Sequence, residues 1–252
     1  EIEADMSTRS PFGLPRGDDN ESSDGNEPSD NSKNLDEMTL SIRGAKARPA
    51  ELDGEIDVQL DTTRGEIILH FRPVEGAINA LICVGGAGGG VSGPADKVYE
   101  RLSAELSEEN ISTVRVEYRE AGEFEESVLD TLAAGSFLKG IGAESAILVG
   151  HSFGGAVAVR AAGLSDIVHG VIALSSQRFG TAEVDRLHKP LLLIHGSADD
   201  VLDKAASEDI FQRASEPKIL EILEGEGHGL AENPEDVFRL IKSFVLNYMK
   251  AS

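Results

Sequence analysis

Short apolar runs alternate with helix-length segments along most of the chain, and this alternation predicts an α/β fold. Strand-like runs bounded by turn residues occupy 56–60, 66–71, 78–84, 112–118, 145–149, 167–174, 190–195 and 218–223. Helix-length segments occupy 94–108, 125–138, 152–163 and 234–250. Strands that are apolar throughout, as at 146–149 and 191–194, must be covered on both faces. We therefore expect a mostly parallel twisted sheet with helices on both faces.

The N-terminal part of the chain departs from this pattern. Residues 17–34 contain no large apolar side chain, and residues 1–37 are strongly acidic. Such a segment cannot bury enough surface to offset its ordering entropy. We interpret 1–37 as a disordered acidic N-terminal tail and 38–54 as a linker. The runs 56–60 and 66–71 then flank a turn ending at Gly65, which predicts an antiparallel hairpin opening a single domain at 55–252.

The net charge and the single cysteine of the chain exclude several classes of partner and of site. Asp and Glu total 45 against 23 Lys and Arg, for a formal net charge of −22, which disfavours nucleic acid. No apolar run reaches the ~20 residues that a membrane span needs, so we expect no membrane insertion. Cys83 is the one cysteine, which leaves no internal disulfide and no clustered-cysteine metal site. We expect a cytoplasmic location; because the sequence begins at Glu1, an organelle lumen or stroma reached through a removed targeting peptide is the alternative.

The sharpest chemical signal is the segment 150–155, which reads Gly-His-Ser-Phe-Gly-Gly between a buried strand and a helix rich in small residues. A serine on so sharp a turn needs glycines on both sides, because larger side chains would clash where the backbone folds back. The turn would present the Ser152 hydroxyl above the sheet edge. It would also leave the Phe153 N–H at a helix start, free to donate to a developing oxyanion. We interpret Ser152 as a nucleophile; the alternative is an ordinary Gly-rich helix start.

A nucleophilic serine needs a base and a carboxylate, and two later loops supply them. The strand run 191–194 leads into a loop with Asp199 and Asp200, and the run 219–223 leads into a loop with His228. Both acids remain candidates on these grounds. The chain order of serine, acid and histidine is the one found in α/β-hydrolases and differs from the orders of the two major serine-protease folds.

On these three motifs, residues 55–250 resemble the α/β-hydrolase superfamily. The resemblance implies the α/β-hydrolase fold, with Ser152 as nucleophile, Asp199 as acid in a His-Gly-x-x-Asp segment and His228 as base. Asp199 is preferred over Asp200 because the family usually places its acid three residues after this glycine. Only 15 residues separate the runs ending at 174 and beginning at 190, too few for a substantial cap domain. The chain is thus similar to small capless serine esterases and to the dienelactone-hydrolase-like branch.

In the family a second oxyanion donor comes from the loop after the third strand, which here is the Gly-rich segment 84–90. The resemblance assigns this role to the Ala87 N–H, with Gly86 and Gly88 as alternatives. The family often has His-Gly at the start of this loop, and Gly85-Gly86 replaces it, which removes a bracing side chain. A phosphate-binding loop is disfavoured, because no Gly-Lys-Ser or Gly-Lys-Thr follows.

The resulting hypothesis is a serine hydrolase that cleaves a small carboxylic ester or thioester through an acyl-enzyme intermediate, with no cofactor and no metal. A peptidase could use the same residues, and a non-catalytic ligand-binding or protein-interaction module on the same fold is the alternative of another class. A protein partner for the acidic tail is left open. We interpret Arg178 as a surface loop arginine; the alternative is a contact that favours a carboxylate-bearing substrate. The remaining polar candidates are interpreted as structural: His151 and His195 as polar contacts, Cys83 as a core residue, and Glu126 and Asp130 as a solvated helix face.

Overall fold

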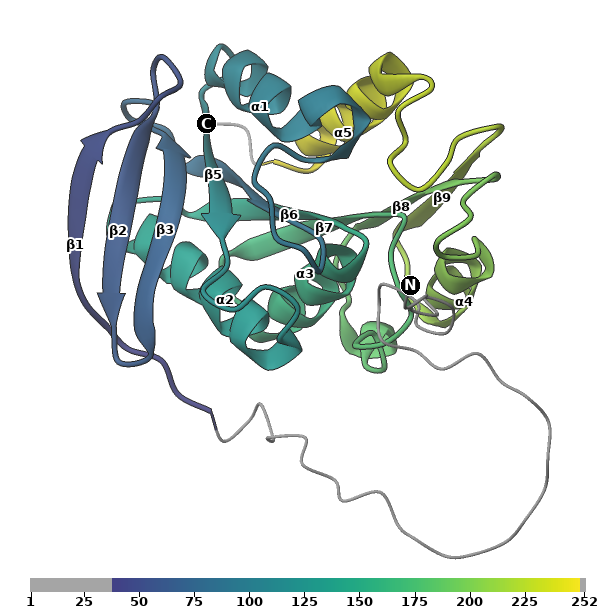
Figure 1. Cartoon of the computed structure of the whole chain (residues 1–252), viewed down its shortest axis with the longest axis horizontal. Helices are drawn as coiled ribbons and strands as arrows, with labels where there is room; N and C mark the ends of the chain where they lie inside the picture. Colours follow the sequence, from purple (N-terminus) through teal and green to yellow (C-terminus); the bar gives the residue numbers. More distant parts are fainter. Residues whose placement is uncertain (1–37, 250–252) are drawn as a thin grey trace, which may run out of the picture. The chain divides into compact units, whose positions relative to one another are not determined.

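The computed structural model describes residues 38–249, and the tail expected at 1–37 lies outside the described residues. All described residues belong to one compact unit, Leu35–Ser252. Within 38–249, nine strands form a single sheet in the order β1-β2-β3-β5-β4-β6-β7-β8-β9 (Figure 1). Their bounds are β1 Ile42–Pro49, β2 Ile56–Thr62, β3 Gly65–Arg72, β4 Asn79–Val84, β5 Ile111–Glu117, β6 Ser145–His151, β7 Val168–Leu174, β8 Leu191–Gly196 and β9 Lys218–Leu223.

The sheet has an antiparallel end and a parallel end, as the sequence predicts. The strands from β1 to β3 pair antiparallel with one another, and β3 pairs antiparallel with β5. From β5 across to β9 every pairing is parallel. The carboxyl ends of β4, β6, β8 and β9 therefore meet at one edge, which is where open α/β sheets place their ligand sites.

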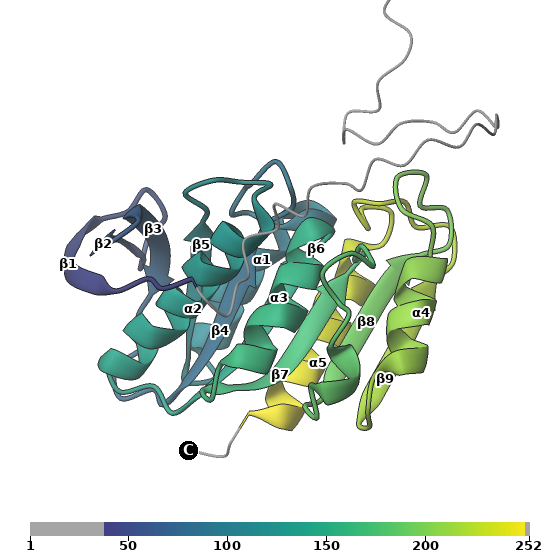
Figure 2. The ribbon, with the colours of Figure 1, turned by 90° about the horizontal axis from the view of Figure 1, so that it is seen from below.

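Helices cover both faces of the sheet, which explains why its central strands are apolar throughout. Helices α1 and α5 pack on one face, and α2 and α3 pack on the other (Figures 1 and 2). In β4, Leu81 and Cys83 point to the α1/α5 side, whereas Ile82 and Val84 point to the α2/α3 side. Alternate side chains of one strand thus enter two separate cores. The helix bounds are α1 Pro94–Ser107, α2 Phe124–Gly140, α3 Phe153–Leu164, α4 Ala205–Arg213 and α5 Pro234–Tyr248.

Two described elements were not expected from the sequence. Residues 38–54, interpreted as a linker, contain the edge strand β1, and a segment left unassigned contains α4. Every residue of β1 is exposed, and Ile42 is its one large apolar residue, so its sequence has no buried face that would mark it as a strand. Its pairing with β2 comes from backbone hydrogen bonds, which composition does not reveal. Arg43, Lys46 and Pro49 on this strand fit an edge protected against further strand pairing.

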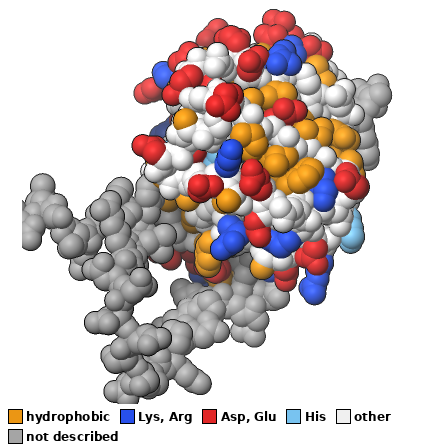
Figure 3. All heavy atoms as spheres, turned by 90° about the vertical axis from the view of Figure 1, so that its right-hand side faces the viewer, with side chains coloured by type: hydrophobic (Ala, Val, Ile, Leu, Met, Phe, Trp, Pro, Cys, Tyr) orange, Lys and Arg blue, Asp and Glu red, His pale blue; other side chains and the backbone are white. Residues whose placement is uncertain are grey.

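The fold has no cap domain, as the short connection after residue 174 predicts. Between β7 and β8 lies only the short 3₁₀ helix η2, Val184–Arg186. The opposite end of the sheet from β1 carries β9 and α4, and Figure 3 shows acidic, basic and hydrophobic side chains interspersed on this face. No helix within residues 38–249 is long and apolar enough to cross a membrane.

Candidate active site

Ser152 lies on a strained turn between β6 and α3, and three glycines make the turn sterically feasible. The backbone of Ser152 has φ 59° and ψ −119°, a conformation that costs a non-glycine residue of order 1–3 kcal/mol. A Cβ on Gly150 would lie 1.9 Å from the carbonyl oxygen of Gly154, and one on Gly154 would lie 2.2 Å from that of Gly85. A Cβ on Gly155 would lie 2.6 Å from the Ser176 hydroxyl. Glycine is therefore required at all three positions.

The structure brings together the serine, the histidine and one of the two candidate acids. The Nε2 atom of His228 lies 3.0 Å from the Ser152 Oγ, and its Nδ1 atom lies 2.8 Å from the Asp199 Oδ2. The Asp199 side chain is fully buried. Asp200 is exposed and makes no comparable contact among the described residues. The loops after β8 and β9 thus deliver one acid and one imidazole to the serine at the end of β6.

The Asp199 carboxylate is held in its charged form by N–H donors. Burial raises the pKa of this carboxyl, but the N–H groups of Leu202, His228 and Val201 more than offset it, so the pKa lies below its usual value. The Oδ1 atom accepts the backbone N–H of Val201 at 2.9 Å and that of Leu202 at 2.8 Å. An ionised acid in this position stabilises the positive charge that a general-base histidine acquires.

His151, which precedes the serine, holds the backbone of the histidine loop. Its Nε2–H donates to the carbonyl oxygen of His228 at 2.9 Å, and the two imidazole rings lie 4.9 Å apart. Desolvation lowers the pKa of His151 to about 4, so this ring is neutral near pH 7. The sequence interpretation of His151 as a polar contact agrees with this geometry.

The Gly-rich loop after β4 lies against the serine and has a brace that sequence reasoning missed. A Cβ on Gly86 would lie 3.8 Å from the Cβ of Ser152, so the loop backbone borders this serine. Arg115 Nη1 donates to the Val91 carbonyl oxygen at 3.1 Å, and its Nη2 donates to Glu55 at 2.5 Å. Both charged side chains are almost fully buried. The one sequence signal for this ion pair was an arginine inside an apolar strand.

The helix α2 carries a buried ion-pair cluster where the sequence predicted a solvated face, and that interpretation was wrong. Asp130 is fully buried and accepts Arg119 Nε at 2.5 Å and the Arg119 backbone N–H at 2.8 Å. Burial raises the pKa of Asp130 despite this pairing. Glu126 is also buried and pairs with Arg64 and Arg119. The charge pattern along the helix did not reveal these partners, because both arginines lie outside it: Arg64 is 62 residues before Glu126, and Arg119 follows β5.

The cysteine and the described titratable groups offer no second reactive centre. Cys83 is buried in β4, and desolvation raises the pKa of its thiol. Such a thiol is a core residue rather than a nucleophile. Within residues 38–249 no cluster of His, Cys, Asp or Glu has the arrangement of a metal site.

An aromatic series connects the serine turn to a neighbouring hollow. The Phe153 ring lies 5.9 Å from that of Phe124, which lies 5.6 Å from that of Phe179. The last two rings line an open hollow of about 690 Å³, together with Arg178. Because the Gln177 N–H donates to the Ser152 carbonyl oxygen at 3.4 Å, the loop bearing Arg178 and Phe179 starts beside the nucleophile.

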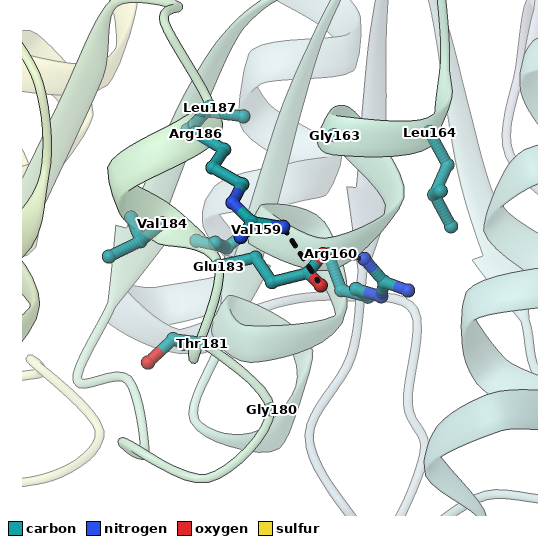
Figure 4. Close-up of a pocket in the computed structure, with 10 residues that line it drawn as sticks. All are labelled: Val159, Arg160, Gly163, Leu164, Gly180, Thr181, Glu183, Val184, Arg186 and Leu187. Atoms are coloured by element: carbon teal, nitrogen blue, oxygen red, sulfur yellow. Dashed lines mark hydrogen bonds and ion pairs between the residues drawn. The ribbon is translucent and has the colours of Figure 1, made fainter. Parts of the chain in front are cut away.

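A second cleft, of about 220 Å³, contains none of the proposed catalytic residues (Figure 4). It lies between α3 and the segment that includes η2. Its acidic residue Glu183 pairs with Arg160 and lies 3.9 Å from Arg186, so one carboxylate faces two guanidinium groups of this cleft.

A family model and several solved structures match this architecture. The model of the dienelactone hydrolase family matches residues 90–249, more than half of the chain. The chain belongs to the dienelactone hydrolase family. The family model makes it a hydrolase, as the resemblance in the sequence implied. No curated protein gives a significant sequence match to this hydrolase.

The solved structures agree with the fold of this dienelactone hydrolase family member. A dienelactone hydrolase from Anabaena variabilis superposes with a TM-score of 0.66 at 17% identity, covering 78% of this chain and 98% of that one. An α/β serine hydrolase without a lid from Xanthomonas campestris gives 0.64 at 21% identity, covering 81% and 100%. The esterase domain of a Rhodothermus marinus protein gives 0.63 at 19% identity, covering 84% and 99%. At these identities the likeness concerns the fold.

Proposed function

We propose that this family member cleaves small carboxylic esters or thioesters through an acyl-enzyme on Ser152, with His228 as the base and Asp199 as the acid. The observation that carries the proposal is the continuous contact from Ser152 Oγ through both nitrogens of His228 to the buried carboxylate of Asp199. A serine hydroxyl in contact with an imidazole whose other nitrogen donates to a carboxylate is an activated nucleophile.

In the first half-reaction the Ser152 oxygen attacks the substrate carbonyl carbon while its proton passes to His228 Nε2. The carbonyl oxygen becomes an oxyanion that accepts N–H donors from Phe153 and Ala87. Phe153 is the first residue of α3, so its N–H has no acceptor within the helix. Breakage of the bond to the leaving group releases an alcohol or thiol, which takes the proton from His228.

In the second half-reaction water replaces the leaving group. His228 accepts a proton from the water, whose oxygen attacks the acyl carbon, and the bond to Ser152 Oγ then breaks. The serine oxygen regains its proton from His228 and the carboxylic acid departs. Asp199 remains ionised and stabilises the imidazolium in both steps, which agrees with its lowered pKa.

The surroundings of the serine favour a small substrate with an exposed leaving group. The absence of a cap between β7 and β8 leaves the site open on the side of the hollow that Phe124 and Phe179 line. No carboxylate within residues 38–249 forms an ion pair with Arg178, so its guanidinium is available to a substrate carboxylate. We infer that substrates with a carboxylate on the acyl side are preferred over neutral ones.

A fluorophosphonate probe with intact-mass detection tests the catalytic proposal. We expect one adduct on the wild type, none on Ser152→Ala, and strongly reduced labelling on His228→Ala. Ser136→Ala removes a hydroxyl that bonds only to the Leu132 carbonyl on α2, so it serves as the matched control with full labelling. Esters, thioesters and amides with the same acyl group then separate esterase, thioesterase and peptidase activity.

Failure of labelling on folded wild type would contradict the proposal. In that case the same fold would act as a non-catalytic binding module, and binding of intact ester without turnover would be the next measurement.

A further inference from the structure

His195, at the end of β8, contacts the same carboxylate oxygen as the proposed catalytic base. Its Nε2 atom lies 3.1 Å from Asp199 Oδ2 and 2.9 Å from the Leu202 carbonyl oxygen. Its Nδ1 atom lies 2.7 Å from the Ser207 hydroxyl on α4. The side chains of His195 and Ser207 are completely buried. The sequence interpretation of His195 as a structural contact did not anticipate its distance to Asp199.

The neighbours of His195 determine which of its nitrogens carries the proton. A backbone carbonyl oxygen accepts hydrogen bonds and cannot donate, so the Nε2 facing Leu202 must bear the hydrogen in the neutral ring. The Nδ1 is then an acceptor, and the Ser207 hydroxyl donates to it. In this tautomer the Nε2–H donates to the Leu202 carbonyl oxygen, and the same nitrogen lies 3.1 Å from Asp199 Oδ2, where the partial positive charge of the N–H faces the carboxylate.

Two groups of contacts surround the Asp199 carboxylate. Oδ1 accepts two backbone N–H groups, and Oδ2 lies between the imidazoles of His228 and His195. His228 donates a hydrogen bond to Oδ2, whereas His195 makes an electrostatic contact with it. Among the described residues, these two imidazoles are the side chains paired with Oδ2.

We propose that His195 is a positioning residue that holds Asp199 Oδ2 in line with His228 Nδ1. This inference rests on the proposed function, because it assigns His195 a role in the same reaction. Asp199 and His228 lie on loops, whereas His195 belongs to β8, which is paired on both sides, and is anchored to α4 through Ser207. The contact therefore limits the movement of the Asp199 carboxylate relative to the sheet. A small displacement of such a group lowers kcat and leaves substrate binding largely unchanged.

The test compares variants that remove the Nε2–H with variants that keep a donor in its place. His195→Leu removes the donor, His195→Gln retains an amide N–H near the Nε2 position, and Ser207→Ala removes only the anchor at Nδ1. His169→Gln is the matched control, because His169 is a partly buried histidine on β7 that contacts the Ile167 carbonyl oxygen. For each protein we would measure kcat, KM, the thermal midpoint, and the proton resonance of the His228 Nδ1–H in ¹⁵N-histidine-labelled protein.

We expect His195→Leu to lower kcat by about 10- to 100-fold, the range expected when a group in the proton-transfer series is displaced, with KM changed less than about twofold. His195→Gln should recover most of this loss, and Ser207→Ala should show an intermediate kcat. The resonance of the His228 Nδ1–H should move in His195→Leu and Ser207→Ala and remain in place in His169→Gln. Ser207→Ala and His195→Gln keep the test decisive if His195→Leu does not fold.

Equal kcat values in His195→Gln, Ser207→Ala and wild type, with an unmoved His228 resonance, would overturn the proposal. So would losses in kcat that follow only the thermal midpoints, without rescue by glutamine. If wild type neither turns over esters nor takes the probe on Ser152, the proposed function fails instead. The His228 resonance then still reports whether His195 positions Asp199.

Discussion

His151 donates its Nε2–H to the backbone carbonyl oxygen of His228 at 2.9 Å, so the residue before the serine holds the loop that bears the proposed base. Because this imidazole is buried, its pKa is about 4 rather than the ordinary 6.5. Protonating His151 in the folded protein would place a second positive charge beside His228 whenever that ring is charged.

The lowered pKa of His151 makes stability fall in mild acid. Between pH 6.5 and 4 the unfolded chain binds this proton and the folded protein does not. The contribution of neutral His151 to the free energy of unfolding is therefore present above pH 6.5. It is lost progressively as the pH falls to about 4, with a total loss of about 3 kcal/mol. Urea denaturation at pH 7, 5.5 and 4 should show a steeper acid loss in wild type than in His151→Gln. Parallel losses in the two proteins would contradict the prediction.

Asp199 and Asp200 are adjacent in sequence, but their substitution by asparagine should have very different effects on kcat. Asp199→Asn leaves a neutral side chain against His228 Nδ1, which should lower kcat by about 10⁴-fold. Asp200→Asn changes an exposed side chain outside the contact series and should leave kcat within about twofold of wild type, as surface changes generally do. Steady-state ester hydrolysis measures both, and an equal loss in the two variants would exclude Asp199 as the specific acid.

The buried pair Glu55–Arg115 should stabilise the fold and the loop beside the serine together. Glu55→Gln leaves the buried Arg115 guanidinium with only the more distant Glu100 carboxylate, at 3.8 Å, as a counter-charge. This change should lower the free energy of unfolding by about 3 kcal/mol, the lower end for a broken buried ion pair. Because Arg115 also holds the Val91 carbonyl oxygen, kcat should fall as well. Chemical denaturation and ester turnover check this prediction. Asp236→Asn, which breaks an exposed ion pair with Arg239, is the control and should change neither quantity appreciably.

Two glycines of α3 should respond oppositely to alanine. In Gly154→Ala the new Cβ would meet the Gly85 carbonyl oxygen at 2.2 Å, so the free energy of unfolding should fall by about 1–3 kcal/mol or more and kcat should fall with it. In Gly163→Ala nothing lies within 4 Å, so the greater helix propensity of alanine should stabilise the protein by about 0.5–1 kcal/mol. Thermal denaturation of both variants at pH 7 decides the sign of each effect.

Arg178 should affect substrate choice rather than chemistry. Arg178→Gln removes the charge that a substrate carboxylate would contact, so KM for an ester with an acyl-side carboxylate should rise about tenfold, as expected for loss of one surface charge-assisted contact. KM for the neutral ester with the same leaving group should stay unchanged. Both esters are assayed with each protein, so the ratio of the two KM values is compared between wild type and variant. An equal rise in KM for both esters would assign Arg178 a general structural effect.

Much of the fold and of the site could be predicted because their signals are local. The turn around Ser152 depends on glycines within a few residues, and the strand runs before Asp199 and His228 place the two loops at one sheet edge. The edge strand β1 and the helix α4 could not be predicted in the same way. Neither has a strongly apolar face that composition alone would distinguish from a loop.

By itself, the sequence determined the α/β architecture, the serine turn and the placement of Asp199 and His228 in loops that follow strands, because backbone sterics and hydrophobic burial act over short stretches of chain. Tertiary structure decided the rest: Asp199 rather than Asp200 against His228, the second imidazole of His195 on the same carboxylate, and the buried partners of Arg115 and Asp130. These contacts join charged or polar groups from separate elements. Their energies depend on distance and burial, which exist only once the chain has folded.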